Sequence, residues 1–333
     1  MFLVDIEHVY NPFLLMDFRF QKCLITGRKV SQSTEFVPLF SSQMRQKFGL
    51  HNQRLTLLSG EQIAYQDLKI PVSMAAQTGG FDQLQKAMQG LFIDEHQALK
   101  WIKAEQLHQY LALIFYAMVY YDIYSLKKQG INSHFLFTDA FQARCQVLHL
   151  VVQSITKKIE FQGFNPESIF AFKLYKDDKQ TPNFDLKINA NTFCIALRLG
   201  SLGIAANVLD NGVQKQFYES YLEKFAYNTL HPIQFDELFS KISYKSYLMN
   251  ITYDYGIQTP EQDGEPLIVA LKIPDEQKDT PIFDQWHDEV YAQILHQNLK
   301  KYGFTADEIY SKTNRSVLNF LEDEQGNFIE HQP

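Results

Sequence analysis

Cysteine is scarce in this chain, and its scarcity argues against a fold held together by disulfides. The 333 residues contain three cysteines, Cys23, Cys145 and Cys194, which are far apart in the sequence. An odd and scattered set is not the pattern of a disulfide framework, and such thiols stay reduced in the cytoplasm. We therefore expect free thiols and a cytoplasmic location.

Long hydrophobic runs are also absent. The most apolar stretch, Tyr110 to Tyr121, is twelve residues long, whereas a helix that spans a bilayer needs roughly 18 to 20 apolar residues. This stretch therefore predicts a buried helix. No basic and apolar leader precedes Asp5, so we expect no secretory signal and no membrane partner.

The common catalytic and cofactor motifs are missing as well. The sequence has no Gly-x-Ser-x-Gly, no Gly-x-Gly-x-x-Gly, no Walker-type loop and no His-Glu-x-x-His. These motifs place nucleophiles, phosphates or zinc ions at defined points of a fold. Without them, the sequence predicts no cofactor and assigns no reaction.

Positive charge is too sparse for a nucleic-acid-binding surface. The formal net charge is −7, and only the first sixty residues are basic, with seven Lys or Arg against four Asp or Glu. Affinity for nucleic acid depends largely on neutralising phosphates with Lys and Arg. A local patch at Arg19, Lys22, Arg28 and Lys29 is one possible exception, but a solvated hairpin face explains it better. Nucleic acid is therefore not an expected partner.

What is present indicates a mixed fold with locally paired strands. We expect a hairpin of two short strands over residues 18–30 and a turn at Asp210-Asn211-Gly212. We expect helices over residues 39–49, 81–92, 94–127, 139–159, 232–249 and 283–301, and strands over 168–175, 183–188, 192–199, 203–209, 250–257 and 266–273. The last helix should bury Trp286, Val290, Ile294 and Leu295. Short links between neighbouring strands permit only antiparallel pairs, because parallel pairs need long crossovers. The fold class is therefore α+β. We expect a small N-terminal hairpin-and-helix module, residues 1–92, packed on a helical and antiparallel-sheet body, residues 93–333.

Residues 17–92 show one ordered series of motifs. The stretch Cys23-Leu24-Ile25-Thr26-Gly27 has the form of a zinc knuckle, Cys-x-x-Cys-Gly, with threonine in place of the second cysteine. Thr34-Glu35-Phe36-Val37-Pro38, a short helix ending at Gly49, Ile70-Pro71-Val72-Ser73 and a helix from Phe81 follow in turn. This order and spacing resembles the HNH endonuclease family, and the resemblance implies a treble-clef fold.

The residues that carry the family's chemistry are replaced here. Of four zinc-ligand positions only Cys23 is kept, with Thr26, Ser73 and Ala76 at the others, and Glu35 stands where the metal-activating histidine would be. A structural zinc site needs about four Cys or His ligands. We therefore expect no bound metal and no metal-dependent cleavage. Two alternatives stay open for this segment: a degenerate treble clef kept as a scaffold, or an unrelated hairpin protein.

In the body, three residues are candidate ligand-binding side chains. Arg198 interrupts an apolar strand, Asp210 follows the neighbouring strand, and His231 precedes a helix. An inward-pointing arginine needs a partner, because an isolated buried charge is prohibitive. A polar pocket, an ion pair with Asp210 or an exposed strand face would each satisfy it.

The sequence thus favours a non-catalytic binding or scaffold protein of the bacterial cytoplasm, derived from an HNH-like nuclease, with an unknown protein or small molecule as partner. The first alternative is an enzyme or small-ligand binder whose site lies in the sheet-containing body. A metal-dependent nuclease is the second alternative. Oligomerisation through the many aromatic residues is a further possibility.

Overall fold

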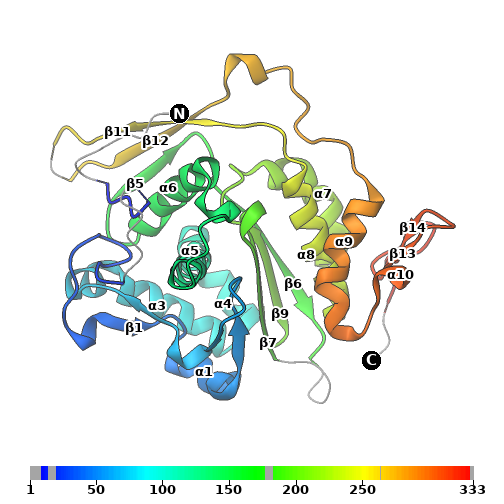
Figure 1. The fold of residues 1–333 in the computed structure, drawn as a ribbon, viewed down its shortest axis with the longest axis horizontal. Coiled ribbons are helices and arrows are strands. Elements are labelled where there is room, and N and C mark those ends of the chain that lie inside the picture. The colour runs from blue at the N-terminus through cyan, green and yellow to red at the C-terminus, as the bar shows by residue number, and fades with distance from the viewer. Residues whose placement is uncertain (1–8, 14–19, 177–182, 263, 331–333) are drawn as a thin grey trace. The chain divides into compact units, whose positions relative to one another are not determined.

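The computed structural model describes residues 9–13, 20–176, 183–262 and 264–330. It confirms the α+β class, because helices and small antiparallel and mixed sheets alternate along the chain (Figure 1). The chain forms two compact units. Unit 1 contains residues 1–164 and 254–272, and unit 2 contains residues 165–253 and 273–333. Unit 1 therefore includes the predicted 1–92 module and part of the predicted body, and the boundary near residue 92 stays a prediction.

Unit 1 is built around two long helices. Its elements are β1 (Phe36–Pro38), α1 (Ser42–Lys47), β2 (Arg54–Thr56), β3 (Gln62–Ala64), β4 (Lys69–Pro71), α2 (Met74–Ala76), α3 (Asp82–Gln89), α4 (Glu95–Trp101), α5 (Ala104–Lys128), α6 (Asp139–Gln153), β5 (Ile159–Gln162), β11 (Asp254–Gln258) and β12 (Leu267–Lys272). The central part of α5 is apolar on every side and buried, as its composition predicts. Thr138 caps α6 by accepting a hydrogen bond from the backbone N–H of Phe141.

Three predictions for unit 1 need correction. The expected helix over 94–127 is divided into α4 and α5, because Lys103 between them is in the extended conformation. The helix expected to reach residue 159 ends at Gln153, and the chain then forms β5, which was not predicted. The expected hairpin over residues 18–30 consists, where the structure describes it, of one bridge between Lys22 and Lys29.

Unit 2 is a five-stranded sheet with helices on one face. Its elements are β6 (Ser168–Leu174), β7 (Phe184–Asn189), β8 (Cys194–Leu199), β9 (Leu202–Asn207), α7 (Val213–Ala226), β10 (Thr229–Leu230), α8 (Pro232–Tyr247), α9 (Asp288–Leu299), α10 (Ala306–Ile309), β13 (Tyr310–Ser311) and β14 (Ser316–Val317). The strand order is β10-β6-β9-β8-β7, and the β7–β8 and β8–β9 pairs, whose strands follow each other in sequence, are antiparallel as predicted. Strand β6 pairs antiparallel with β9 instead of lying beside its sequence neighbour β7, an arrangement that was not predicted. The short β10 pairs with β6 in parallel.

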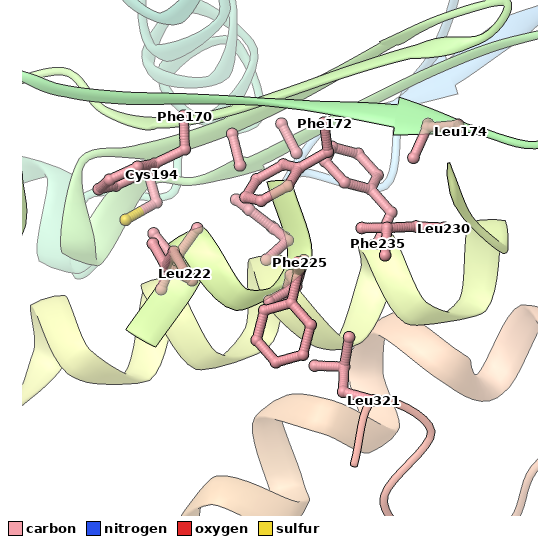
Figure 2. Close-up of a cluster of buried hydrophobic side chains, with 14 residues drawn as sticks. Phe170, Phe172, Leu174, Cys194, Leu222, Phe225, Leu230, Phe235 and Leu321 are labelled. Carbon is pink, nitrogen blue, oxygen red and sulfur yellow. The ribbon is translucent and has the colours of Figure 1, made fainter. Parts of the chain in front are cut away.

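The core of unit 2 lies between this sheet and the helices α7 and α8. Phe170 and Phe172 of β6 point from the sheet toward Leu222 and Phe225 of α7 and Phe235 of α8 (Figure 2). Burying a side chain of this size stabilises a fold by roughly 1.5 to 3 kcal/mol. This apolar layer fixes α8 against the sheet, and so positions the polar residues that α8 also carries.

Two predictions for unit 2 are wrong in detail. Helix α7 was not predicted, although the turn before it was, and Gly212 in that turn has the left-handed conformation expected of it. The last helix buries Tyr291 and Leu295, whereas Val290, expected inside, is 37 % exposed. Because consecutive helix residues are about 100° apart, a one-residue error in phase exchanges a buried position for an exposed one.

Candidate functional site

The knuckle-like turn at Cys23 is a closed loop held by its own hydrogen bonds. The backbone N–H of Cys23 donates to the carbonyl of Arg28 at 2.7 Å, and Gly27 N–H donates to the carbonyl of Cys23 at 2.9 Å. The N–H of Thr26 lies 3.4 Å from Cys23 Sγ, which accepts it. Gly27 has φ 73°, a left-handed value that glycine adopts without strain. The lone thiol therefore has a partner within the turn itself, and it is buried.

Two further contacts fix the turn within unit 1. Leu24 N–H donates to the carbonyl of Pro71 at 2.7 Å, so the turn is bonded to the end of β4. On its other side, the carbonyl of Leu24 lies 2.6 Å from Nε2 of His149, a fully buried residue of α6. A carbonyl can only accept, so in the neutral ring Nε2, which makes the shorter contact, is the donor, and the Tyr10 carbonyl, 3.0 Å from Nδ1, accepts from Gln153 Nε2 at 3.0 Å. Gln153 Nε2 donates to the other ring nitrogen, Nδ1, at 2.9 Å.

The environment of His149 keeps its imidazole neutral. Burial lowers the pKa of His149 to about 4, and this effect outweighs the opposing effect of the carbonyls of Leu24 and Tyr10. Both ring nitrogens are engaged by protein groups, so neither is directed at a ligand. His149 thus acts as a polar clasp between α6 and the Cys23 turn.

Ser73 and Ala76, the second pair of expected zinc-ligand positions, lie at the start and end of the short helix α2. Ser73 is the N-cap residue of α2 and is buried, as is Ala76 one turn later. The Glu35 carboxylate accepts the N–H groups of Ser31, Gln32 and Met74, and these bonds lower its pKa. Glu35 therefore joins the segment before β1 to the start of α2, a contact that needs no metal.

The structure does not bring Arg198, Asp210 and His231 together. Arg198 is only 4 % exposed, and its guanidinium donates to the carbonyls of Tyr175 and Gly200. His231 caps α8 at the same end of the sheet. Asp210 follows Asn207, which pairs with Cys194 at the other end of β8, about 13 Å from Arg198 at 3.3 Å per residue. An exposed Arg198 and an Arg198–Asp210 ion pair are therefore both excluded.

Asp210 has a local role at the start of α7. Its carboxylate accepts the N–H groups of Gly212 at 3.1 Å and Gln214 at 3.0 Å. The residue is fully buried, and this burial raises the pKa of the carboxyl to about 6 although its hydrogen bonds act in the opposite direction. Asp210 is thus a buried cap for α7.

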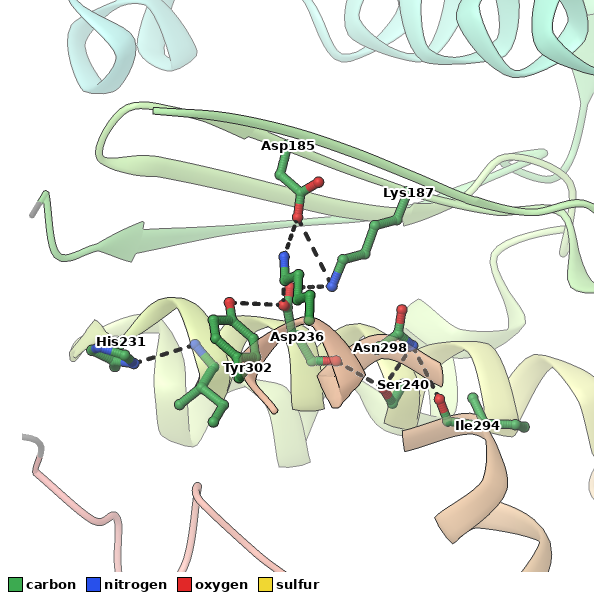
Figure 3. Close-up of polar contacts among 10 residues, drawn as sticks. Asp185, Lys187, His231, Asp236, Ser240, Ile294, Asn298 and Tyr302 are labelled. Carbon is green, nitrogen blue, oxygen red and sulfur yellow. Dashed lines mark hydrogen bonds and ion pairs between the residues drawn. The ribbon is translucent and has the colours of Figure 1, made fainter. Parts of the chain in front are cut away.

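A cluster of four charged residues lies between the sheet and the helices of unit 2 (Figure 3). Asp185 and Lys187 point from β7 toward Asp236 of α8, and Lys301 joins them from the turn after α9. The Lys301 ammonium is 2.6 Å from Asp185 and 2.9 Å from Asp236, and Lys187 forms a short ion pair with Asp236. Tyr302 also donates its hydroxyl to Asp236, at 2.9 Å. We call these five residues the lysine–aspartate cluster.

The two lysines of this cluster differ in exposure and in basicity. The side chain of Lys301 is 40 % exposed and that of Lys187 is 14 % exposed. Burial lowers the pKa of Lys187 by more than its attraction to Asp236 raises it, and the charge of Lys301 lowers it further. Burial also opposes the charge of Lys301, but Asp236 and Asp185 outweigh it and raise its pKa. Lys187 is therefore the first of the two to lose its proton.

Sequence reasoning identified one neighbour of the cluster and none of its members. Arg198 lies directly opposite Asp185 in the β7–β8 register, and opposite residues project from the same face of a sheet. Asp185 and Lys187 are two residues apart, which is the period of one strand face. This two-residue spacing is the sequence signal that could have identified Asp185 and Lys187, but any strand with one polar face shows it. Asp236 and Lys301 are distant from these residues in the sequence, so no spacing pattern connected them to the cluster.

Across the described ranges, no three His, Cys, Asp or Glu side chains are grouped as metal ligands. None of the helices in this part of the chain combines the length and the apolar composition needed to cross a membrane. Comparison of the chain with protein-family models, with curated proteins and with solved structures gives no match.

Proposed function

We propose that this chain is a non-catalytic binding or scaffold protein. In this proposal, residues 20–92 are a degenerate treble clef in which protein contacts replace the metal. The observation that carries it is the closure of the Cys23 turn. The Sγ atom accepts Thr26 N–H, and the peptide of Leu24 is bonded on both sides, to Pro71 and to His149.

The physical argument concerns what a structural zinc ion contributes. Such an ion holds a knuckle turn against the first turn of a helix, and it supplies folding free energy by doing so. Here the Cys23 turn is joined through Leu24 to Pro71 at the end of β4, three residues before α2 begins, and α6 adds a histidine clasp. A turn fixed in this way needs no ion. The segment then serves as a rigid surface for a partner protein or small molecule.

The experiment is a metal analysis of the purified protein together with unfolding measured in excess chelator. We expect no stoichiometric zinc and the same thermal midpoint with and without chelator. A Cys23→Ser variant should also keep its midpoint within a few degrees, because the thiol makes one weak bond. One zinc ion per chain, or a large loss of stability in chelator, would overturn the proposal.

A second candidate function is small-ligand binding in unit 2, and the lysine–aspartate cluster favours it. Charged groups are seldom held in a protein interior, and unequal pKa values in one cluster are typical of functional sites. Asp185 is 31 % exposed and Lys301 is 40 % exposed, so the cluster reaches the surface. Isothermal titration of Lys187→Met against the parent protein with a panel of small anions and carbonyl compounds tests this function. Identical titrations for both proteins would refute it.

A further inference from the structure

Helices α7 and α8 and the segment before α9 lie side by side in unit 2 (Figure 1), and together they present four aromatic side chains at the surface. Tyr247 is 63 % exposed and Phe217 is 47 % exposed, and Phe283 and Trp286 are half-buried. The Phe217 and Phe283 rings contact each other at 6.5 Å between centroids. Tyr247 and Trp286 both contact the buried ring of Tyr244, at 6.1 and 4.6 Å. We call Phe217, Tyr247, Phe283 and Trp286 the aromatic surface.

Hydrogen bonds to α8 fix the segment that carries Phe283 and Trp286. The N–H of Asp284 donates to the carbonyl of Leu248 at 2.7 Å. The Tyr244 hydroxyl accepts from the N–H of His287 and donates to its carbonyl, both at 3.2 Å. A surface held in one conformation loses little conformational entropy when a partner binds, and this favours recognition.

Carboxylates flank the aromatic surface, and they have no ion-pair partner among the residues that the structure describes. Asp284 and Asp288 are exposed on either side of Trp286 in the sequence, and Glu289 follows in the first turn of α9. Trp286 Nε1 donates to Asp288 Oδ1 at 3.0 Å, so one carboxylate is fixed at the edge of the indole ring. The helix dipole favours carboxylates in a first turn, which explains Asp288 and Glu289 but not Asp284.

A lysine of α8 already lies on these rings. Lys245 Nζ is 4.2 Å from the centroid of the Phe283 ring and 6.0 Å from that of Tyr218. Aromatic rings attract a cation that lies over their face, so this contact indicates that the aromatic surface stabilises positive charge. One ammonium against the carboxylates of Asp284, Asp288 and Glu289 leaves the region with an excess of negative charge.

We propose that the aromatic surface binds an arginine-containing segment of another protein. This binding goes beyond the scaffold function proposed for residues 20–92 and does not depend on it. A guanidinium group can stack on an aromatic face and pair with a carboxylate through its N–H groups at the same time. Trp286 and Asp288 offer this combination at one point, because Asp288 Oδ2 has no hydrogen-bond partner among the described residues.

The charges distinguish this partner from two others. A wholly apolar partner would cover Asp284, Asp288 and Glu289 and leave their carboxylates without counter-ions, which is costly. A nucleic acid or an anionic membrane would be repelled by the same carboxylates. A basic peptide segment covers the rings and pairs the carboxylates, so it satisfies both parts of the surface.

The test uses Trp286 as a fluorescent reporter of the aromatic surface. The chain has two tryptophans, so Trp101→Phe leaves Trp286 as the source of tryptophan emission in the full chain. The probe is the blocked hexapeptide Gly-Arg-Gly-Arg-Gly-Arg, and we expect it to change this emission saturably. The corresponding Gly-Glu peptide and vesicles of phosphatidylglycerol should leave the emission unchanged. No saturable change with the arginine peptide, or an equal response to the acidic peptide or the vesicles, would overturn the proposal.

Two charge-matched variants separate recognition from general attraction to an acidic protein. Asp284→Asn with Asp288→Asn removes two charges at the aromatic surface and keeps an oxygen that accepts the Trp286 N–H. Asp307→Asn with Glu324→Gln removes two exposed charges elsewhere in unit 2. We expect the first pair to weaken peptide binding at least about fivefold and the second to change it by less than about twofold. Equal weakening by the two pairs would show general attraction and refute the site.

A matched pair of tyrosine variants tests the contribution of the rings. Tyr247→Ser removes a ring of the aromatic surface, and Tyr227→Ser removes a ring that is 93 % exposed at the C-terminal end of α7. We expect the first to weaken binding about threefold or more and the second to leave it unchanged. The corresponding Gly-Lys peptide should bind less tightly, because an ammonium does not stack as a guanidinium does. Equal affinity for the lysine peptide, or parental affinity in a Tyr247→Ser variant that circular dichroism shows to be folded, would contradict the proposal.

Discussion

The clasp formed by His149 predicts a specific loss of stability in acid. The folded protein lowers the pKa of His149 from 6.5 to about 4, so the native state favours the neutral imidazole. The resulting stabilisation is complete above the unfolded pKa of 6.5 and is lost as the pH falls toward 4. A tenfold change in the acid dissociation constant corresponds to about 1.4 kcal/mol, so acidification from pH 7.5 to 4.5 removes on the order of 2 to 3 kcal/mol at this residue.

Other groups titrate over the same range, so the measurement must be differential. The His149→Gln variant keeps a side-chain donor for the Leu24 carbonyl but has no titrating ring. We expect the free energy of unfolding of the parent, relative to this variant, to fall by that 2 to 3 kcal/mol between pH 7.5 and 4.5. Urea unfolding followed by circular dichroism at the two pH values gives this double difference. His51→Gln, at an exposed histidine, is the control and should leave the difference unchanged.

Amide hydrogen exchange at the Cys23 turn tests locally what the free energy of unfolding tests for the whole protein. Amide exchange of residues 23–28 should accelerate in the parent at pH 4.5 once corrected for intrinsic rates, because opening exposes the buried imidazole to solvent, where it takes up a proton more readily. If the double difference is below about 0.5 kcal/mol, which is within ordinary additivity error, the neutral clasp is not what holds the turn. The reasoning about His149 would then be wrong.

Two further predictions concern single positions. A Cβ added at Gly80 would overlap the backbone carbonyl of Ile155, whereas one added at Gly79 meets nothing within 4 Å. Thermal unfolding should therefore show a loss of about 1 to 3 kcal/mol for Gly80→Ala and a much smaller change for Gly79→Ala; equal effects would refute the close approach. At Asp210, the folded pKa is raised from 3.8 to about 6, so its stabilisation is present below pH 3.8 and is lost as the pH rises through 6. The parent should lose on the order of 3 kcal/mol relative to Asp210→Asn between pH 3.5 and 7, and urea titrations that show no such trend would contradict this.

The parts of the fold that were predictable are those whose signals are local. Helix α5 was recognisable from an apolar run too short for a membrane, and the antiparallel order of β8 and β9 from the short link Gly200-Ser201-Leu202-Gly203, of which only Gly200 and Ser201 lie outside the strands. Helix α7 was not found, because Gly212 before it is a weak helix-start signal beside Ser, Thr, Asp or Asn. The parallel pairing of β5 with β12 leaves no turn signal, since its partners are far apart in sequence.

The candidate sites show the same limit. Arg198 was identifiable because a charge in an apolar strand is unusual, and it is indeed buried. The lysine–aspartate cluster was not identifiable, because Asp185 and Lys187 have the alternation of an ordinary strand and their partners are on helices. His149 lies in an apolar helix and is one of the ten histidines of the chain. Its partner is a backbone carbonyl, which every residue type supplies, so the sequence did not mark this contact.

The order of the elements in unit 1 has a consequence for biosynthesis. Strand β5 emerges from the ribosome early, but its neighbour β12 follows roughly a hundred residues later, after the whole of β6 to α8. Closing so long a segment is entropically costly and slow. During translation β5 therefore has an unpaired edge that is available to chaperones or to another copy of the nascent chain. The interval between synthesis of β5 and synthesis of β12 is therefore a period in which β5 is exposed to misassembly.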